Sequence, residues 1–481
     1  MSAPASKSAR RTRIVAAAIA AIAVAASGIA LAQRSMEARP AGPAAAPPTN
    51  GPAAPAANAT AAGNAAAADP QLERGRYLAR AADCVSCHTA PGGAPFAGGL
   101  PMQTPFGTVV STNITPDPQA GIGNYTEADF ANALRKGVGK GGHRLYPAMP
   151  YTSFARVSDE DMRDMYAYFR KGVQPVAQRP PPTQLPWPFS MRGLMVFWNW
   201  LYLDDAPYKP DAARSAEWNR GAYLVNGLGH CGECHTPRSR LGGLKAASTL
   251  DGDSFLSGAV VDGWYAQPLR HGLKNGAAQW RTADLVQYLH TGRTERSGAF
   301  GPMAQVVENS TQHMTPNDLA AIATYLQSVG APAGYVPPAP KGESAVAAAA
   351  PPAHADTIRL HDGTVEGQRG AMVYLNNCNG CHRSSGAGWE NTFPALAGNS
   401  VVTANDPTSL IRIVLGGASM PATAKAPTPL AMPGFGWRLS DDDVAQLLTF
   451  VRASWGNQAA AVSSAQVASV RKALPAPVKE K

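Results

Sequence analysis

The order of apolar and polar residues predicts the same helical elements three times along the chain. Apolar residues recur at spacings of three and four, which indicates amphipathic helices, and most of these stretches begin at a Ser, Thr or Asp suited to an N-cap. The predicted middle helices cover 126–138, 282–292 and 406–416, and the predicted closing helices cover 158–170, 315–327 and 440–452. No strand pattern of comparable length occurs, so we expect an all-α fold.

These helical sets recur at a constant interval. Cys84, Cys231 and Cys378 stand 147 residues apart (84 to 231 and 231 to 378), and each follows a short predicted helix that begins with Arg-Gly. A period of this length corresponds to whole domains rather than to a solenoid. We therefore expect three tandem domains of similar size.

Composition divides the chain further. Residues 33–70 are mostly Ala, Pro, Gly and Asn without an apolar face, which predicts a disordered tether. The predicted domains are 71–180, 211–336 and 357–458. Two Pro-rich linkers are predicted between them: 181–210, which contains an apolar helix and overlaps a proline cluster at 173–188, and 337–356. A tail covers 459–481. The tail has apolar residues partly at helical spacing, so it is either a weak amphipathic helix or a capping tail.

The first 32 residues indicate export. Four basic residues between positions 7 and 13 precede an uncharged apolar stretch, Ile14 to Ala32, that ends in Ala-Leu-Ala. This pattern predicts a signal peptide cut before Gln33, and the alternative is a retained N-terminal anchor helix. In both cases the body of the chain lies outside the cytoplasm.

A second apolar segment, Met191 to Leu203, is too short to span a bilayer. It contains Trp198, Trp200 and Tyr202, residue types that are frequent at membrane interfaces. We expect it to be a buried helix between the first two domains. The alternative is a surface that touches the membrane or a quinone.

Charge and cysteine content narrow the class of protein. The 481 residues carry a formal net charge of +9, but no Lys/Arg run with interleaved aromatics appears, so we expect no nucleic-acid partner. All six cysteines fall into three close pairs, which leaves none for an ordinary disulfide framework.

A histidine follows each cysteine pair directly, and C-x-x-C-H is the attachment signature of c-type haem. The three motifs are Cys84/Cys87/His88, Cys231/Cys234/His235 and Cys378/Cys381/His382. Two thiols one helical turn apart can add to the two vinyl groups of a porphyrin, and the adjacent histidine then binds the iron. Zinc would need a second pair about 15–20 residues away, and a redox dithiol would sit near a strand–helix pattern; neither occurs here.

A methionine in a Pro/Gly-containing turn before each closing helix is the candidate sixth iron ligand. The candidates are Met149, Met303 and Met432, with Met314 and Met420 as rivals and His143, His271 and His313 as bis-histidine alternatives. Each methionine could also be an ordinary core residue. Met/His ligation raises the iron potential and closes the coordination sphere, which favours electron transfer over O2 chemistry.

Several short motifs in residues 71 to about 470 resemble the triple-haem cytochrome c subunits of membrane-bound, quinone-reducing dehydrogenases for alcohol, gluconate, sorbitol and fructose. The motifs are Thr104 to Thr108 (TPFGT), Ser111 to Asp117 (STNITPD), Leu145 to Tyr151 (LYPAMPY), Asn309 to Gln312 (NSTQ) and Trp455 to Asn457 (WGN). The resemblance implies the ligand pairs His88/Met149, His235/Met303 and His382/Met432. It also implies a separate flavin- or quinone-cofactor dehydrogenase subunit and transfer to ubiquinone at the periplasmic face of the inner membrane. The long tether before residue 71 departs from the family pattern and leaves N-terminal anchoring open.

We therefore expect three tandem class I cytochrome c domains joined by Pro-rich linkers. Together they form a subunit that relays electrons through three haems and contains no substrate-oxidising site of its own. No nucleophile–base set or dinucleotide fingerprint is found. One alternative is a free-standing carrier or oxidase-linked cytochrome without a dehydrogenase partner. The other is a haem enzyme such as a peroxidase, which would need an open iron site.

Overall fold

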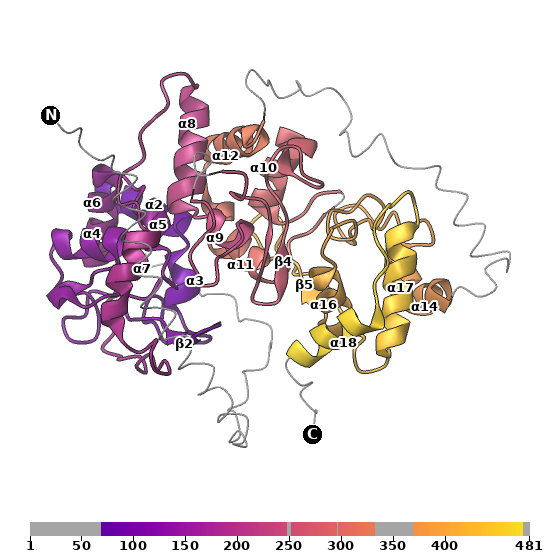
Figure 1. Cartoon of the computed structure of the whole chain (residues 1–481). Helices are drawn as coiled ribbons and strands as arrows, with labels where there is room; N and C mark the ends of the chain where they lie inside the picture. The colour runs from indigo at the N-terminus through magenta and orange to yellow at the C-terminus, as the bar shows by residue number, and fades with distance from the viewer. Residues whose placement is uncertain (1–68, 248–251, 296, 332–368, 475–481) are drawn as a thin grey trace, which may run out of the picture. The chain divides into compact units, whose positions relative to one another are not determined.

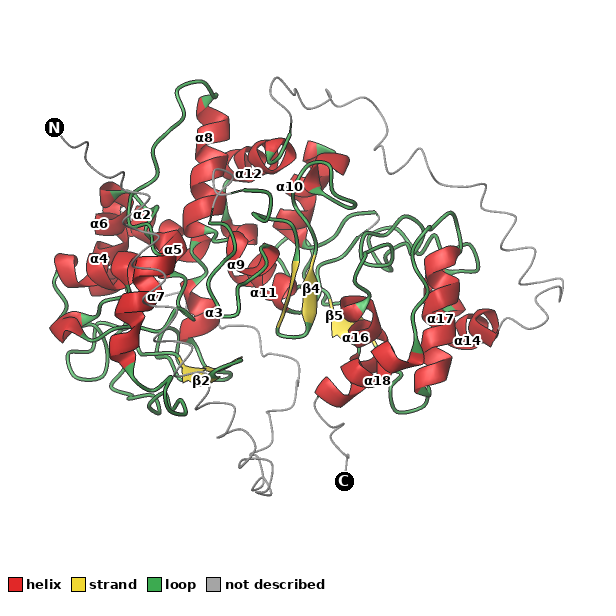
Figure 2. Ribbon diagram, viewed as in Figure 1, coloured by secondary structure: helices red, strands yellow, loops and turns green. Residues whose placement is uncertain are grey.

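The computed structural model describes residues 69–247, 252–295, 297–331 and 369–474. The predicted signal segment 1–32, the tether up to residue 68 and the linker 337–356 lie outside the described residues. The described chain is mostly helical (Figure 2), which confirms the predicted all-α class. Three short antiparallel ribbons were not predicted: β1 (Pro101–Thr104) with β2 (Gly107–Val110), β3 (Ala259–Val261) with β4 (Trp264–Ala266), and β5 (Ala418–Ser419) with β6 (Ala431–Met432). They are too short to give an alternating sequence pattern.

The same helix crossing occurs three times, once in each sequence repeat: the first repeat (71–180), the second (211–331) and the third (369–474). The crossing pairs are α2 (Pro70–Ala81) with α6 (Asp159–Ala167), α8 (Ala216–Tyr223) with α12 (Pro316–Ser328), and α14 (Arg369–Asn377) with α17 (Asp441–Ala453) (Figure 1). A Cβ on Gly75, Gly221 or Gly370 would stand 1.9–2.1 Å from a backbone oxygen of the partner helix. The two backbones therefore touch at the glycine of each Arg-Gly pair, and no larger residue fits there.

The predicted helix starts are confirmed by side-chain caps. Ser158, Thr315 and Ser440 each accept a hydrogen bond from the backbone N–H three residues on, which satisfies one free donor of the first turn. The predicted middle helices are α4 (Glu127–Lys136), α10 (Thr282–Thr291) and α16 (Thr408–Gly416).

The remaining helices are short. They are α3 (Cys84–His88), α5 (Tyr151–Phe154), α7 (Met195–Tyr202), α9 (Gly232–His235), α11 (Pro302–Asn309), α15 (Asn379–His382) and α18 (Ser464–Ala473). Helices α6 and α8 run on as π-helical turns over Tyr168–Gly172 and Leu224–Leu228. Among the described residues, 3-10 turns cover Lys140–Gly142, Arg192–Leu194, Ala277–Gln279 and Thr311–His313.

Two hydrophobic cores serve the three repeats. The first core joins Phe130 and Met165 of the first repeat with Leu228 and Leu319 of the second. The third repeat has a separate core, into which α18 inserts the fully buried Val467. The first two repeats therefore share one packed interior, which their linear separation in sequence did not indicate.

The proline-rich stretch 173–188 lies along the first repeat. The Asn113 side chain donates to the carbonyl oxygens of Val176 and Gln178, at 2.8 and 2.9 Å. The backbone N–H of Val110 donates to the Thr183 hydroxyl at 2.9 Å. Hydrogen bonds therefore hold this segment against the first repeat, although the segment has almost no secondary structure.

The expectation that 191–203 is a buried helix was wrong for most of its residues. Within α7 only Trp198 is buried, and its indole donates to the Leu241 carbonyl of the second repeat. Asn199 ties the helix to the first repeat through the Lys136 carbonyl. A single buried face is enough to hold α7, while Phe197 and Trp200 on its other side are 67% and 56% exposed. No helix in the described part of the chain has the length and apolar content needed to cross a bilayer.

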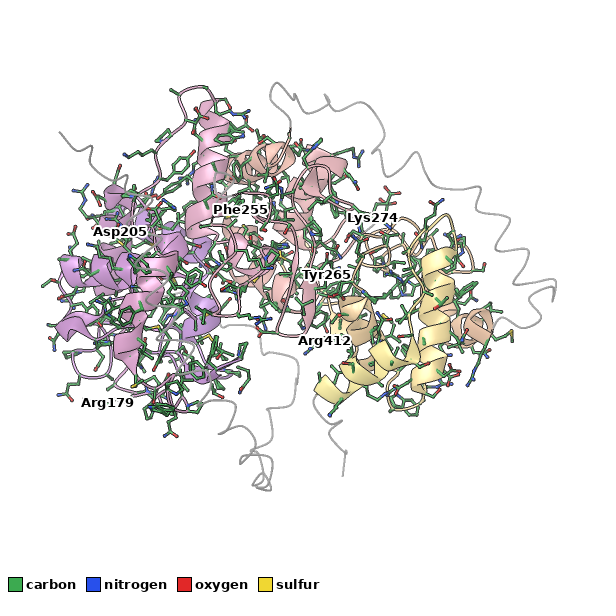
Figure 3. All side chains as sticks on the ribbon, in the orientation of Figure 1. Arg179, Asp205, Phe255, Tyr265, Lys274 and Arg412 are labelled. Carbon is green, nitrogen blue, oxygen red and sulfur yellow. The ribbon has the colours of Figure 1, made fainter. Side chains whose placement is uncertain are left out.

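The second and third repeats meet through β4 and α16, near Tyr265 and Arg412 (Figure 3). The Tyr265 backbone N–H donates to the Ser409 hydroxyl at 2.7 Å. The Arg412 guanidinium stacks over the Trp264 ring, 4.9 Å from its centroid. Both of these contacts involve polar groups.

Further hydrogen bonds join the second and third repeats away from β4. The Ala422 backbone N–H donates to the Glu308 carboxylate at 2.7 Å, and the Arg293 guanidinium donates to the Pro421 carbonyl oxygen at 3.2 Å. This interface is therefore largely polar, in contrast to the hydrophobic core that the first two repeats share.

Candidate haem sites

Each C-x-x-C-H motif lies on a short helix directly after the first helix of its repeat. Helices α3, α9 and α15 carry the motifs. All six cysteines belong to the described residues and none forms a disulfide. In the described chain, no three His, Cys, Asp or Glu side chains converge as ligands of a single metal ion. The thiols are therefore arranged as pairs along a helix rather than as a closed zinc shell.

In the second and third motifs the two thiols differ in burial, which the motif alone did not predict. Cys234 and Cys381, the second cysteines of the second and third motifs, are exposed, whereas the other four cysteines are partly buried. Nothing lies within 4 Å of where a Cβ would stand on Gly380, directly before Cys381, so this side of α15 is uncovered. A thiol that adds to a porphyrin vinyl group must be within reach of it, and the open side of Cys381 allows this. Cys381 is therefore accessible at the surface of the third repeat, unlike a buried structural cysteine.

The three histidines share one hydrogen-bond arrangement. His88 Nδ1 lies 2.6 Å from the Thr112 carbonyl oxygen, His235 Nδ1 lies 2.6 Å from that of Gln267, and His382 Nδ1 lies 3.0 Å from that of Pro394. Burial lowers the pKa of each imidazole, so the rings are neutral and the proton sits on Nδ1 facing the carbonyl. Nε2 is then left as a lone-pair donor in a fixed orientation, as iron ligation requires.

Unpartnered polar atoms flank two of the motifs. The side-chain amide of Gln267, whose carbonyl binds His235, is buried with no partner at either its nitrogen or its oxygen. Asn377 and Asn379, on both sides of Cys378, each bury an oxygen without a donor. Buried polar groups of this kind are normally satisfied, so they fit a polar group that is still to be added beside the motif. The residues present therefore fit a covalently attached haem.

The three candidate methionines lie in different local structures. Met149 precedes α5 and packs against the core shared by the first two repeats. Met303 is the second residue of α11, directly after Pro302. Met432 lies in β6, opposite Ala418, and packs against the third core. All three side chains are partly buried.

The rival ligands occupy other surroundings. Met420 is buried, and its sulfur lies against Gly298 of the second repeat, 2.8 Å from where a Cβ would stand there. Met314 is buried within the shared core. His143 and His313 are exposed, and His143 Nδ1 lies 2.9 Å from the Lys140 carbonyl oxygen.

The environment of the first motif is acidic and partly buried. Asp83 precedes Cys84 in a left-handed turn, and the Ser86 hydroxyl donates to its carboxylate at 2.5 Å. Burial raises the pKa of Asp83 to about 7, against which the Ser86 bond acts. Burial, together with the negative charges of Asp83 and Cys234, raises the pKa of the Cys87 thiol to about 11. The second motif therefore lies within electrostatic reach of the first.

Sequence reasoning missed the residues that join the first two repeats. Asp161 and Asp318, each three residues after the N-cap of a closing helix, accept hydrogen bonds from a tyrosine of the other repeat, Tyr223 and Tyr77 respectively. A tyrosine follows Arg-Gly in two of the three repeats and could have drawn attention to this contact. A single sequence, however, does not show which residue that tyrosine binds.

Comparison with known proteins places these sites in a class. The sequence profile of the family described as cytochrome c matches residues 72–172 and 367–455. With three C-x-x-C-H helices and oriented histidines, the chain is a cytochrome c, and this family binds haem c covalently.

More specifically, the chain belongs to the family of cytochrome c subunits of gluconate, alcohol and fructose dehydrogenases. It is 47% identical over 411 residues to the gluconate 2-dehydrogenase cytochrome c subunit of Pantoea cypripedii, covering 84% of this chain and 90% of that protein. It is 44% identical over 414 residues to the cytochrome c subunit of the quinone alcohol dehydrogenase of Gluconobacter oxydans, covering 86% and 84%. It is 38% identical over 416 residues to the fructose dehydrogenase cytochrome subunit of Gluconobacter japonicus, covering 85% and 84%. These relatives support an electron-transfer role beside a catalytic dehydrogenase subunit.

Proposed function

We propose that this chain carries three covalent haems, one in each of three tandem class I cytochrome c domains, and relays electrons from a dehydrogenase subunit to ubiquinone at the periplasmic face of the membrane. The observation that carries the proposal is the threefold recurrence of a histidine held through Nδ1 by a backbone carbonyl beside two free thiols. Each bound haem supplies an iron that gains and loses one electron.

The proposed cofactor-binding residues follow the motifs. The pairs Cys84/Cys87, Cys231/Cys234 and Cys378/Cys381 hold the haems, and the iron ligands are His88 with Met149, His235 with Met303, and His382 with Met432. In the third repeat Met432 is favoured over Met420 because the Met420 sulfur is already packed against Gly298. Two protein ligands on each iron leave no position for oxygen or peroxide, which suits electron transfer.

We place substrate oxidation in the partner subunit. The relatives are cytochrome subunits of gluconate, alcohol and fructose dehydrogenases, which supports a partner that sets the substrate. In this proposal the partner also carries the flavin or quinone cofactor. Reducing one ubiquinone takes two electrons and two protons. The haems deliver the electrons one at a time, and water supplies the protons at the membrane surface.

The proposed membrane contact is the α7 surface, which we define as the exposed apolar side chains between Trp187 and Leu201. Fourteen large hydrophobic residues of the described chain are exposed, and eight of them belong to this surface: Trp187, Phe189, Met191, Leu194, Val196, Phe197, Trp200 and Leu201. A contiguous exposed apolar patch marks an interaction site. Aromatic residues among aliphatic ones, in a chain of net charge +9, favour the interface of an anionic bilayer.

Vesicle binding of the mature protein tests this contact. We expect Phe197→Ser with Trp200→Ser to weaken sedimentation with anionic vesicles, whereas Met372→Ser, at a residue of the third repeat that is 52% exposed, should leave it unchanged. Equal binding by the double variant and the parent protein would show that another part of the chain holds the membrane.

Haem counting and quinone reduction test the central proposal. Absorbance of the pyridine haemochrome should give three haems per chain, and two after Cys84→Ala with Cys87→Ala. The protein purified from its host should bring a dehydrogenase subunit with it, and the complex should reduce ubiquinone when substrate is added. A cytochrome that purifies without a dehydrogenase and reduces no quinone would contradict the proposal, as would fewer than three haems. Cell fractionation and N-terminal sequencing test export and cleavage before Gln33.

A further inference from the structure

The haem-attachment motifs of the first two repeats are each held by the other repeat. Asn309 of the second repeat donates to the Ser86 hydroxyl, inside the first motif, at 2.8 Å. Thr152 and Ser153 of the first repeat donate to the carboxylate of Glu233, inside the second motif, at 3.2 and 3.1 Å. Ser86 and Glu233 occupy the same position, directly before the second cysteine. The contact is therefore reciprocal.

A second pair of contacts repeats the exchange away from the motifs. Tyr77 donates to Asp318 at 2.5 Å, and Tyr223 donates to Asp161 at 2.6 Å. Tyr77 and Tyr223 follow the Arg-Gly pair in their repeats, and each aspartate lies three residues after the cap of its closing helix. Equivalent residues that contact each other in both directions are the mark of a two-fold interface, here built within one chain. The shared hydrophobic core lies under this interface.

The third repeat, described over 369–474, has no counterpart of the tyrosine–aspartate contact or of the contact at the residue before the second cysteine. Arg369 pairs with Asp443 at 2.6 Å, as Arg74 pairs with Asp161 and Arg220 with Asp318. The tyrosine, however, is replaced by Met372, which is 52% exposed. Gly380 stands where Ser86 and Glu233 stand, and it offers no side chain to hold.

Each reciprocal contact also closes a short path between an iron ligand and the opposite motif. Helix α11 begins next to the proposed ligand Met303 and ends at Asn309, whose side chain binds Ser86 beside Cys87. In the other direction, Met149 lies three and four residues before Thr152 and Ser153, which bind Glu233 beside Cys234. One hydrogen bond is the only break in the covalent chain in each direction.

We propose that the haem sites of the first two repeats form a coupled pair that exchanges electrons directly, with Asn309 and Glu233 as its positioning residues, while the third site lies outside this pair. The inference rests on the proposed electron relay. In each exchange one ferrous iron loses an electron and the other, ferric, iron gains it; no bond breaks and no proton moves. The Glu233 carboxylate is itself held by Arg238 at 2.6 Å, so the pair adds little net charge between the sites.

The first test asks whether the two sites sense each other. In the full, haem-loaded chain, the three midpoint potentials are assigned by the shift that Met149→Ala, Met303→Ala or Met432→Ala causes. We expect Met149→Ala to move the second potential as well as the first and to leave the third unchanged. Three potentials that respond only to their own methionine would overturn the pair.

The second test asks whether Asn309 and Glu233 position the two haem sites for electron exchange. A light pulse absorbed by an added flavin photoreductant delivers less than one electron per chain, and redistribution of that electron between haems is followed by absorbance. We expect Asn309→Ala with Glu233→Gln to slow the exchange between the first two haems several-fold, while each haem keeps its own spectrum. Asn391→Ala, an exposed asparagine of the third repeat, is the matched control and should change nothing. Ser86→Ala removes the Asn309 contact more gently and should slow the exchange in the same direction.

An unchanged rate in both the double variant and Ser86→Ala would overturn the positioning role. Failure of the proposed function looks different: fewer than three haems, or no quinone reduction by the complex. Failure of the inference leaves three haems and quinone reduction intact but gives independent sites.

Discussion

The phenol of Tyr223 donates a 2.6 Å hydrogen bond to the Asp161 carboxylate and so joins the second repeat to the first. Asp161 is 3% exposed, and it also pairs with Arg74 within its own repeat. Removing one donor from a buried carboxylate leaves that group partly unsatisfied, which is more costly than losing a hydrogen bond at the surface.

We therefore expect Tyr223→Phe to lower the free energy of unfolding by about 1–3 kcal/mol. Denaturant unfolding followed by circular dichroism measures the change. The control is Tyr146→Phe, because the Tyr146 hydroxyl donates to the exposed Phe189 carbonyl and its loss should have little effect. Equal stability of both variants would mean that the Tyr223 contact contributes nothing to the interface.

The glycine at a helix crossing gives a second prediction. A Cβ on Gly221 would stand 1.9 Å from the Ala321 carbonyl oxygen, so Gly221→Ala must push α8 and α12 apart. We expect a loss of about 1–3 kcal/mol or more, as for an overpacked core. Gly193→Ala is the control, since nothing lies within 4 Å of its added methyl group. Thermal unfolding of the two variants side by side should show a lower midpoint for Gly221→Ala alone.

The third iron ligand can be assigned by comparing two methionines. We expect Met432→Ala to keep the haem attached but lower its potential and allow CO to bind, because the thioether ligand is lost. Met420→Ala should leave the haem spectrum unchanged and reduce stability only, since its side chain packs against Gly298. Reduced-minus-CO difference spectra and redox titration separate the outcomes. CO binding by the Met420 variant alone would reverse the assignment.

A pH dependence is expected from Asp83. Burial raises the pKa of this carboxyl from 3.8 to about 7 in the folded chain. The folded protein thus favours the protonated form, and the associated stability is present below about pH 4 and is lost as the pH rises through 7. Ionisation also places a negative charge beside the first haem, which stabilises the ferric state.

The first midpoint potential should therefore fall as the pH rises through about 7. Asp83→Asn should remove this step and leave the other two potentials as they were. Redox titrations between pH 5 and pH 9 measure the step, and a slope that persists in the variant would assign it to another group.

Local patterns were sufficient to predict the helices and the motifs. The caps at Ser158, Thr315 and Ser440 and the apolar stripes behind them are properties of neighbouring residues, and the structure places helices where they predict them. The short ribbons were missed because strands of two to four residues leave no detectable alternation. The apolar segment around α7 was misjudged because composition does not tell which side of a helix is covered. The exposure of Cys381 was not predicted for the same reason.

The sequence by itself determined the chemistry of this protein: three cysteine pairs, each with an adjacent histidine, at intervals of 147 residues. Each motif consists of neighbouring residues, so it can be recognised in a single sequence. Only the tertiary structure decided how the repeats are grouped, because Tyr77 and Asp318 lie 241 residues apart and form a pair solely through packing. The sequence shows Met372 at the position of that tyrosine in the third repeat. That the third repeat therefore lacks the tyrosine–aspartate contact becomes clear only from the interface between the first two repeats.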